Sequence, residues 1–541
     1  MLKILLGIIV FILILGVIVL IHEGGHFFFA KRAGILCYEF SIGMGPLIWQ
    51  KKIGETYYSI RAIPIGGYVS MAGEEIENNL LKDYQYAHLT LGEDGKVKEI
   101  FAIKDLEGKM PENLGPDDFY QIIGSDLIGT KEELPGELFI TILQDGAEVR
   151  YEAARDCLVR FTPKQAMQIA PYNRLFVNKK LLQRFLTIFA GPFMNFVLAL
   201  GVFFFLGLAS GYTNYKTTVL GSVEEATPAY EAGLRTGDEV IYIGTNEVTY
   251  NNWQDISDQM AIYAKGQDFS GSVLLTYERD GVRYTVTINP YVYVQTIQLL
   301  FVRDGSDSLV VDEYPNNNTE TMTYKAGLQK GDVLISINDV PFENRMQVLE
   351  YFSTGDGANT SKFRLKVLRN GETVELNEIE SYQKAIFDDN GIEVCKVLLG
   401  ISPTVTRNIG RLLWEPLKKV GSSCTVIIKT LGRLFRPKSG LKITDLSGPV
   451  GIASATISII DQGAYSIFNW MAILSVNIGL MNIIPLPALD GGRLAFILYE
   501  VITRKKPNPK VENIIHTIGF ILLMVLFVFV AFNDVIKLIF K

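Results

Sequence analysis

The stretch ILLGIIVFILILGVIVLIHEGGH, residues 4–26, decides the fold of this chain. Its apolar part, residues 4–21, carries no charge and is about as long as a helix that crosses the core of a bilayer. A signal peptide is the competing interpretation, because Lys3 precedes the hydrophobic run. The run is longer than the core of a usual signal peptide, and no small-residue cleavage site follows it. We therefore expect a first membrane-spanning helix.

The same stretch ends in His22-Glu23-Gly24-Gly25-His26, which has the spacing of a zinc motif. On a helix, residues four apart share a face, so both imidazoles can reach one ion while Glu23 lies beside it. A glutamate in this place can accept a proton from a water molecule that the metal has made acidic. The alternative is a polar helix end that emerges into water. The location favours a metal site, because ionisable groups at membrane depth are costly and usually functional.

Three further stretches are apolar and long enough to cross a membrane, and the last two flank a short loop. They lie at residues 185–208, 463–489 and 514–532, each near the ~20 residues of a spanning helix. Four spans place both chain ends on the same side. The loop between the last two spans carries five basic residues, so we expect it in the cytoplasm.

A third metal ligand is expected at Asp490, where the stretch NIIPLPALDGG (residues 482–492) closes the third span. Pro485 and Pro487 interrupt a helix, and irregular backbone at membrane depth is tolerated only where protein or a cavity covers it. Two histidines leave a catalytic zinc ion one protein ligand short. The alternative is an acid that merely starts a loop, because Asp-Gly is common in turns.

Composition limits the other functions. The chain has 541 residues, more than one core supports, and a net charge of −7 gives no reason to expect nucleic-acid binding. Its four cysteines lie singly, so neither a disulfide framework nor a cysteine zinc site is indicated.

An internal repeat occupies the region between the second and third spans. KAGLQKGDVLISIN (325–338) echoes EAGLRTGDEVIYIG (231–244), and each copy covers about 90 residues, a small domain rather than a solenoid unit. A helix ended by glycine, a Gly-Asp turn and an alternating strand predict a small α/β unit that resembles a PDZ domain. PDZ domains bind extended peptides at a sheet edge, and peptide binding and a spacer role both stay open.

Two other regions lie outside the spans. Residues 76–176 form a soluble stretch of mixed charge with β-like runs at residues 138–143 and 147–151, which we interpret as a cytoplasmic insert. Residues 409–435 have apolar side chains at helical spacing interrupted by basic ones. Such a helix commonly lies on a membrane surface, and packing against the repeats is the alternative.

Taken together, the His22-Glu23-x-x-His26 motif, the Leu489-Asp490-Gly491 segment and tandem PDZ-like repeats between the second and third spans resemble the site-2 proteases. The likeness is strongest to the bacterial branch with tandem PDZ domains. It covers most of the chain, and the three features fall in the order of the family. One departure is the insert, which is longer than expected and leaves cytoplasmic regulation open.

The resemblance implies a zinc metalloendopeptidase that cleaves transmembrane segments of single-pass proteins, such as anti-sigma factors or signal-peptide remnants. It implies Glu23 as the catalytic residue and His22, His26 and Asp490 as the ligands of Zn2+. It also implies a membrane-associated β-hairpin at residues 40–68 that presents an edge to the substrate. The residues that it assigns to substrate binding are Asn195, Asn482, Pro485, Pro487, Gly66 and Gly67.

We therefore expect a multi-span α-helical membrane protein with four transmembrane helices, two α/β PDZ-like extracytoplasmic domains and a β-rich cytoplasmic insert. The active site faces the cytoplasmic side, and the partners are membrane-protein substrates, the lipid bilayer and peptide termini at the repeats. The expected parts are the first span with the zinc motif (1–34), the hairpin (35–75), the insert (76–176), the second span (181–210), two PDZ-like domains (213–295 and 296–385), the amphipathic helix region (403–442), and the third and fourth spans (463–492 and 511–536).

Two rival functions use the same features differently. A non-enzymatic membrane scaffold would capture peptides with the repeats, but it has no need of the complete metal set. A transporter also has broken helices and intramembrane acids, although four spans with large outer domains fit it less well. Flux into liposomes would identify a transporter.

The topology gives the first testable prediction. In an otherwise cysteine-free variant, Ser308→Cys should react with an impermeant thiol reagent in intact cells, whereas Asn508→Cys should react only after permeabilisation. The physical reason is the basic short loop, which stays in the cytoplasm. The reverse labelling pattern would invert the protein, and equal labelling of both positions would mean that one expected span does not cross.

Overall fold

The computed structural model describes the chain in two compact units, residues 1–209 with 412–541, and residues 210–411. The described residues are 2–74, 80–106, 114–129, 137–162, 165–266, 272–294, 296–301, 308–312, 321–353, 356–360, 362–380, 387–388, 391–392, 395–434, 448–460 and 462–539.

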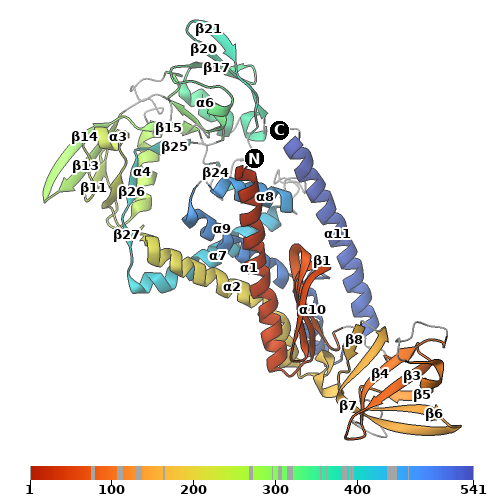
Figure 1. The fold of residues 1–541 in the computed structure, drawn as a ribbon. Helices are drawn as coiled ribbons and strands as arrows, with labels where there is room; N and C mark the ends of the chain where they lie inside the picture. Colours follow the sequence, from red (N-terminus) through yellow and green to blue (C-terminus); the bar gives the residue numbers. More distant parts are fainter. Residues whose placement is uncertain are drawn as a thin grey trace. The chain divides into compact units, whose positions relative to one another are not determined.

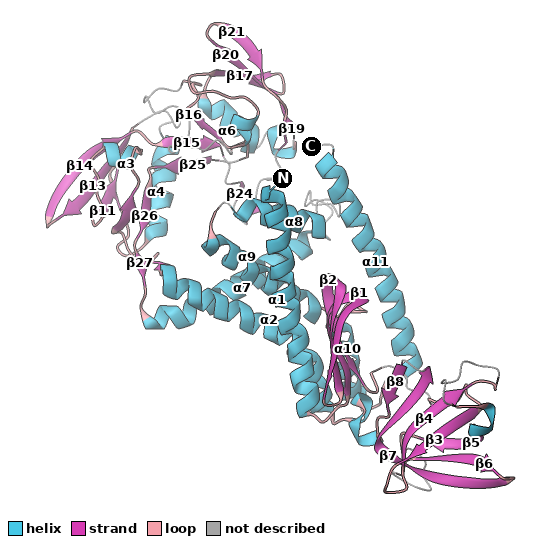
Figure 2. Cartoon of the chain, in the orientation of Figure 1, coloured by secondary structure: helices cyan, strands magenta, loops and turns pink. Residues whose placement is uncertain are grey.

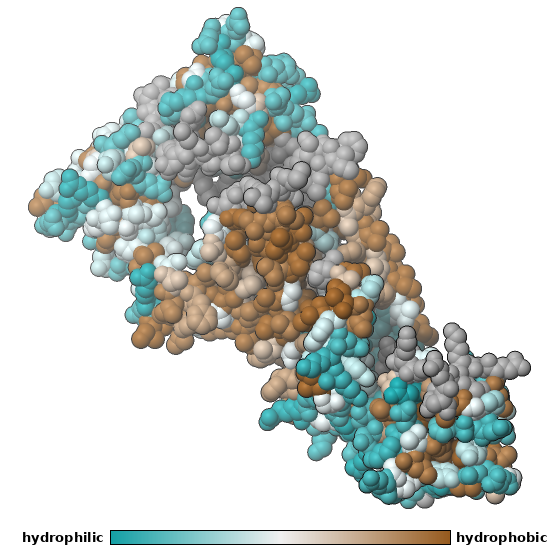
Figure 3. Space-filling model, viewed as in Figure 1, coloured by the Kyte–Doolittle hydropathy of each residue, from teal (hydrophilic) through white to brown (hydrophobic). Residues whose placement is uncertain are grey.

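Four long apolar helices form the frame of the first unit (Figure 1). They are α1 (Leu2–Arg32), α2 (Leu181–Ser210), α9 (Ala464–Ile483) and α11 (Pro509–Ile539). Each is long and apolar enough to cross a membrane, which confirms the four predicted spans. Hydrophobic surface covers this helical part of the molecule in Figure 3. Such exposure suits contact with lipid rather than water.

Three further helices accompany these four: α7 (Ile409–Leu434), α8 (Pro449–Ile460) and α10 (Asp490–Thr503). The third apolar stretch is not one helix, because α9 ends at Ile483 and α10 starts at Asp490, with both prolines between them. The side of α7 that carries Val420, Cys424 and Ile427 packs against α2 and α9. Helix α8, which contacts α1, α9 and α11, was not predicted from the sequence.

A long hairpin follows α1 and doubles back on itself. It consists of β1 (Cys37–Ile53) and β2 (Thr56–Met71), and residues 39–42 of β1 pair both with residues 57–60 and with residues 67–70 of β2. The bends fall at Gly43, Gly45 and Gly66, whose positive φ angles suit glycine. Residues 40–68, where a hairpin was predicted, lie within these two paired strands.

The insert is a small β-barrel (Figure 2). Its strands follow the order β4-β3-β5-β6-β7-β8, and a parallel pairing of β4 with β7 closes the sheet on itself. The strands are β3 (Tyr86–Leu91), β4 (Val97–Ile103), β5 (Tyr120–Asp126), β6 (Phe139–Gln144), β7 (Ala147–Thr162) and β8 (Gln165–Gln168), accompanied by the short 3-10 helices η1 (Pro116–Asp118), η2 (Tyr172–Arg174) and η3 (Phe176–Asn178). Both β-like runs predicted from the sequence are strands of this barrel.

The barrel is joined to the chain just after the C-terminal end of α1 by backbone hydrogen bonds. The Leu36 N–H donates to the Arg174 carbonyl, the Ala72 N–H donates to the Leu36 carbonyl, and the Phe176 N–H donates to the Ala72 carbonyl. The chain segments that lead into and out of the barrel therefore bond both to Leu36 and to each other, and they hold the barrel against the base of the helix.

The second unit contains the internal repeat as two sheets with the same topology. The sheet orders are β12-β11-β13-β14 and β18-β17-β20-β21. In each copy an arginine at the end of the third of these strands forms an ion pair with the aspartate of the Gly-Asp turn, Arg279 with Asp238 and Arg369 with Asp332, both at 2.7 Å. The first copy comprises α3 (Pro228–Glu231), β11 (Glu239–Ile243), β12 (Asn246–Glu247), α4 (Trp253–Gly266), β13 (Val273–Arg279) and β14 (Val282–Ile288). The second comprises α5 (Met322–Lys325), β17 (Val333–Ile337), β18 (Val340–Pro341), α6 (Arg345–Ser353), β20 (Leu365–Arg369) and β21 (Glu372–Glu375).

The chain returns to the first repeat after it has completed the second. Strand β26 (Ile401–Pro403) pairs with β10 (Leu220–Val223), and Leu399 belongs to the core of the first repeat. Strand β15 (Tyr291–Val294) lies between β16 (Leu299–Phe301) and β25 (Cys395–Leu398). The first repeat thus extends beyond residues 213–295. The remaining elements are β9 (Tyr212–Thr213), β19 (Lys362–Phe363), η4 (Asp356–Asn359), β22 (Ile379–Glu380), β23 (Phe387–Asp388), β24 (Gly391–Ile392) and β27 (Val405–Thr406).

A charge cluster at the hairpin turn makes stability depend on pH. Hydrogen bonds from Arg174 and Lys31 hold the pKa of Glu55 at about 2, below its usual value near 4.5. Because the folded pKa is depressed, this stabilisation is complete above the pKa of the unfolded state and is lost as the pH falls toward about 2.

We therefore predict that Glu55→Gln lowers the unfolding temperature most at neutral pH, and that the gap from the unsubstituted protein narrows between about pH 5 and pH 2. Thermal unfolding of the detergent-solubilised chain measures the gap. Glu93→Gln, at an exposed position of the β3–β4 turn, is the control and should show no comparable gap. A gap that stays constant over this pH range would contradict the prediction.

Candidate metal centre

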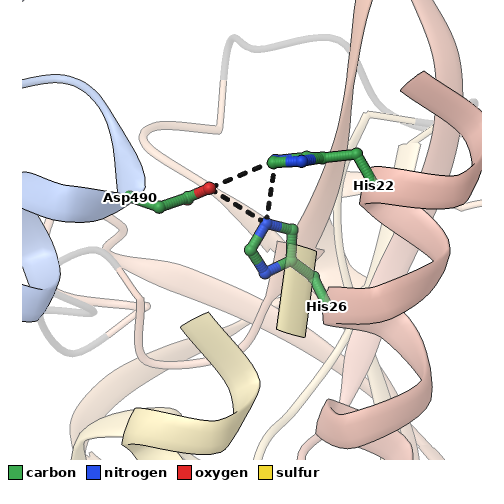
Figure 4. Close-up of side chains that lie close together, drawn as sticks. All are labelled: His22, His26 and Asp490. Atoms are coloured by element: carbon green, nitrogen blue, oxygen red, sulfur yellow. Dashed lines mark hydrogen bonds and ion pairs between the residues drawn. The ribbon is translucent and has the colours of Figure 1, made fainter. Parts of the chain in front are cut away.

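Three side chains from distant parts of the chain converge in the first unit. His22 and His26 lie one turn apart on α1 and are 8% and 6% exposed, and Asp490 is the first residue of α10. Figure 4 shows the two rings and the carboxylate pointing toward one another. His22 Nε2 lies 3.1 Å from Asp490 Oδ2, His26 Nε2 lies 3.3 Å from the same oxygen, and the two Nε2 atoms are 3.3 Å apart.

These distances fit a zinc ion. The edge of a tetrahedron is about 1.6 times the centre-to-corner distance, so zinc bonds of about 2.0–2.1 Å place neighbouring ligand atoms about 3.3–3.4 Å apart. The three measured separations, 3.1–3.3 Å, are close to this value. Two imidazoles and one carboxylate are also a donor set that catalytic zinc sites use, with one position left for water.

The orientation of each imidazole is set by a group on α2. The Nδ1 atom of His26 lies 2.8 Å from the carbonyl oxygen of Thr187, to which it donates, so Nε2 is left free to bind metal. The Nδ1 atom of His22 lies 3.1 Å from Nδ2 of Asn195, a fully buried side chain. Helix α2 therefore supports both histidines from behind.

Helices α1 and α2 come this close because glycine lies at their contact. A Cβ atom added to Gly191 would stand 2.1 Å from Nε2 of His26, and one added to Gly25 would stand 2.5 Å from the carbonyl oxygen of Ala190. No side chain fits at either place without displacing its neighbour.

Asp490 is positioned by a tightly packed loop. A Cβ atom at Gly491 would lie 2.0 Å from the carbonyl oxygen of Ile484, so the start of α10 rests directly on the preceding backbone. From α11, Nδ1 of His516 accepts a hydrogen bond from the Ala488 N–H at 3.0 Å, where the backbone has a φ of 71°. The N-terminal position on α10 also favours the negative charge of Asp490.

The residues predicted to bind substrate fall into three groups. A Cβ atom at Gly67 would lie 3.0 Å from Cγ of Glu23, so this part of β2 runs beside the glutamate, and Gly66 precedes it in the bend. Asn482, Pro485 and Pro487 lie at the end of α9 and on the loop that leads to Asp490, and Pro485 is exposed. Asn195 lies behind His22.

Two residues that support the centre, Thr187 and His516, were not predicted from the sequence. Thr187 acts through its backbone carbonyl, which side-chain patterns do not reveal. His516 had a signal, because it is one of only four histidines and lies in an apolar span.

Comparison with known proteins identifies a family of metal-dependent peptidases. A model of peptidase family M50 matches residues 10–526. The zinc metalloproteases RasP of Geobacillus kaustophilus and Shouchella clausii are each 31% identical to this chain, over 531 and 530 residues, and 98% of both chains is covered in either case. A putative zinc metalloprotease of Staphylococcus aureus is 30% identical over 539 residues, again with 98% of each chain covered.

Two glycines on α2 provide a matched test of the centre. Gly191→Ala should displace His26 and lower zinc affinity by about 10- to 100-fold, as for the loss of a group that supports a ligand. Gly201→Ala should leave zinc affinity unchanged, because a Cβ there meets nothing within 4 Å. Titration of metal-free protein with zinc against a chromophoric chelator measures both. Equal affinities in the two variants would contradict the geometry.

Proposed function

The chain belongs to peptidase family M50 and is a multi-pass membrane zinc metalloprotease, and from this premise we propose that it cleaves transmembrane segments of single-pass membrane proteins. In this proposal His22, His26 and Asp490 hold the zinc ion and Glu23 is the catalytic residue. The observation that carries it is the meeting of three donor atoms within 3.3 Å at the inner part of an apolar helix.

The chemistry is peptide hydrolysis. When bound, the zinc ion supplies a Lewis acid that makes a water molecule more acidic and polarises the peptide carbonyl. Glu23 adjoins His22 in the helix without belonging to the three-donor cluster, which suits a general base. Its carboxylate accepts the proton of the attacking water and then delivers a proton to the departing amine.

The substrate has to be extended to be cut. A transmembrane substrate arrives as a helix, in which the scissile carbonyl is hydrogen-bonded and shielded, so that it must unwind locally. The position of Gly67 beside Glu23 supports a role of the hairpin at residues 40–68 in binding the extended substrate by β-addition. Asn482, Pro485 and Pro487 border the break between α9 and α10, and an interrupted helix at membrane depth suits a site that binds a peptide backbone.

We place the centre toward the cytoplasm and the repeats outside, for the reasons of charge given above. The donor cluster found among the described residues lies wholly in the membrane unit, so the repeats act on substrate choice. As PDZ-like domains they either bind peptide termini or exclude bulky substrates. Anti-sigma factors and signal-peptide remnants are the proposed substrate classes.

We predict that Glu23→Gln and Asp490→Ala inactivate the enzyme in different ways. Glu23→Gln should retain one zinc ion and lose proteolysis by at least about 100-fold, because it removes the base and spares the ligands. Asp490→Ala should lose both activity and most of the zinc. The measurements are elemental analysis of purified protein and cleavage of a model transmembrane substrate.

The control for Asp490→Ala is Asp534→Ala. Asp534 is also a buried acid of the membrane unit, but it accepts hydrogen bonds from the Gly448 and Gly451 N–H groups at the start of α8. Folded Asp534→Ala protein should keep its zinc. Full activity in Glu23→Gln, or full zinc in Asp490→Ala, would refute the respective role.

A further inference from the structure

We propose that Asn195 is a positioning residue that holds the imidazole of His22 for metal ligation, and that it does not contact the substrate. This inference rests on the proposed function, because it assumes that His22 binds zinc. It differs from the substrate-binding role expected of Asn195 from the sequence.

The first observation is the burial of the side chain. Asn195 is 0% exposed, and its amide lies 3.1 Å from the ring nitrogen of His22 that faces away from Asp490. A side chain enclosed in this way, behind a ligand, is separated from any chain that enters the centre by the ligand itself.

The second observation is that the residue is anchored independently of the centre. The hydroxyl of Ser475 on α9 donates to the Asn195 carbonyl at 2.8 Å. A Cβ atom at Gly479 would lie 3.1 Å from Cβ of Asn195, so α9 packs closely on it. The amide is thus presented to His22 from a rigid contact between two helices, as a positioning group requires.

The third observation is the hydrogen-bond chemistry of His22. Its Nε2 atom faces Asp490 and His26, so metal binds there and the ring proton must sit on Nδ1. A buried N–H group needs a hydrogen-bond acceptor. Rotation of the Asn195 side-chain amide by 180° exchanges Oδ1 and Nδ2 with little change of shape, so that Oδ1 accepts the hydrogen bond from the Nδ1–H of His22. Oδ1 of Asn195 otherwise has no hydrogen-bond partner among the described residues.

The neighbouring histidine shows the same arrangement. Nδ1 of His26 donates to the carbonyl of Thr187, which lies on the same helix as Asn195. Each metal-binding ring is therefore matched by one oxygen acceptor from α2, a backbone oxygen for His26 and an amide oxygen for His22.

The test uses two substitutions of nearly the same shape. Asn195→Asp retains only acceptors and should keep zinc affinity near that of the unsubstituted protein. Asn195→Leu has no polar atom and should lower zinc affinity by about 10- to 100-fold, the usual cost of losing a group that orients a metal ligand. Zinc is titrated into metal-free, full-length protein in detergent against a chromophoric chelator.

Three further readouts separate positioning from packing and from substrate binding. Thr456→Val is the control, because it removes a buried hydroxyl of α8 that bonds the Ile452 carbonyl and the Trp470 indole rather than a residue of the centre, and it should leave zinc affinity unchanged. The visible spectrum of bound Co2+ should change in Asn195→Leu and not in Thr456→Val. At saturating zinc, the KM of Asn195→Leu for a transmembrane substrate should equal that of the unsubstituted protein.

Two results would overturn the inference: unaltered zinc affinity in Asn195→Leu, or a raised KM together with unaltered affinity, which would mean substrate contact. If Asn195→Leu does not fold, Asn195→Asp decides alone, and loss of its zinc affinity by more than 10-fold would refute an acceptor role. Failure of the proposed function looks different, because His22→Ala would then bind zinc as tightly as the unsubstituted protein.

Discussion

Zinc binding by His22 and Asp490, as proposed, demands that donor atoms 468 positions apart in the sequence come to 3.1 Å of each other, and much of the membrane unit is built to satisfy this demand. The demand is severe because imidazole rings and a carboxylate are flexible in themselves, while a metal tolerates only small errors in their placement. The structure meets this demand through close contacts between backbone segments. Glycines let helices α1 and α2 approach until no room remains for a methyl group, and another glycine seats the start of α10 on the preceding loop. The precise placement of the donor atoms thus comes from backbone contacts that leave no room for movement.

Ion pairs link the hairpin and the exit of the barrel to the helices that carry the proposed metal ligands. The hairpin runs beside Glu23, its turn carries Glu55, and that carboxylate is held by Lys31 of α1 and Arg174 at the exit of the barrel. Arg493, three residues after Asp490, forms an ion pair with Glu74 at the end of the hairpin. The polypeptide on both sides of the metal centre is therefore tied to the segment that leads into the barrel.

The parts of this structure that sequence alone predicted are those with local signals. A spanning helix is visible as an uncharged run, the histidine pair as a helical spacing, and strands β6 and β7 as β-like runs. The prolines before Asp490 predicted the break between α9 and α10. What escaped prediction depends on tertiary contact. Closure of the barrel needs β4 to meet β7, the return of β26 to the first repeat needs the second repeat to be finished, and the Thr187 carbonyl carries no side-chain signature.

The nesting of one repeat within the other brings the two ends of the second unit together. Strand β9, where the unit begins, pairs with β27, where it ends, and the side chain of Arg411 contacts Asn214 across the same junction. A domain whose first and last strands pair with each other can be inserted into a host chain in the place of a single loop. Such a domain can be lengthened, exchanged or duplicated during evolution without moving the helices that flank it in the sequence. Its two ends already lie together, so these changes place no new constraint on the membrane unit. The enzyme thus consists of a membrane unit whose side chains must keep a precise geometry and a second unit whose sequence and length can change more freely.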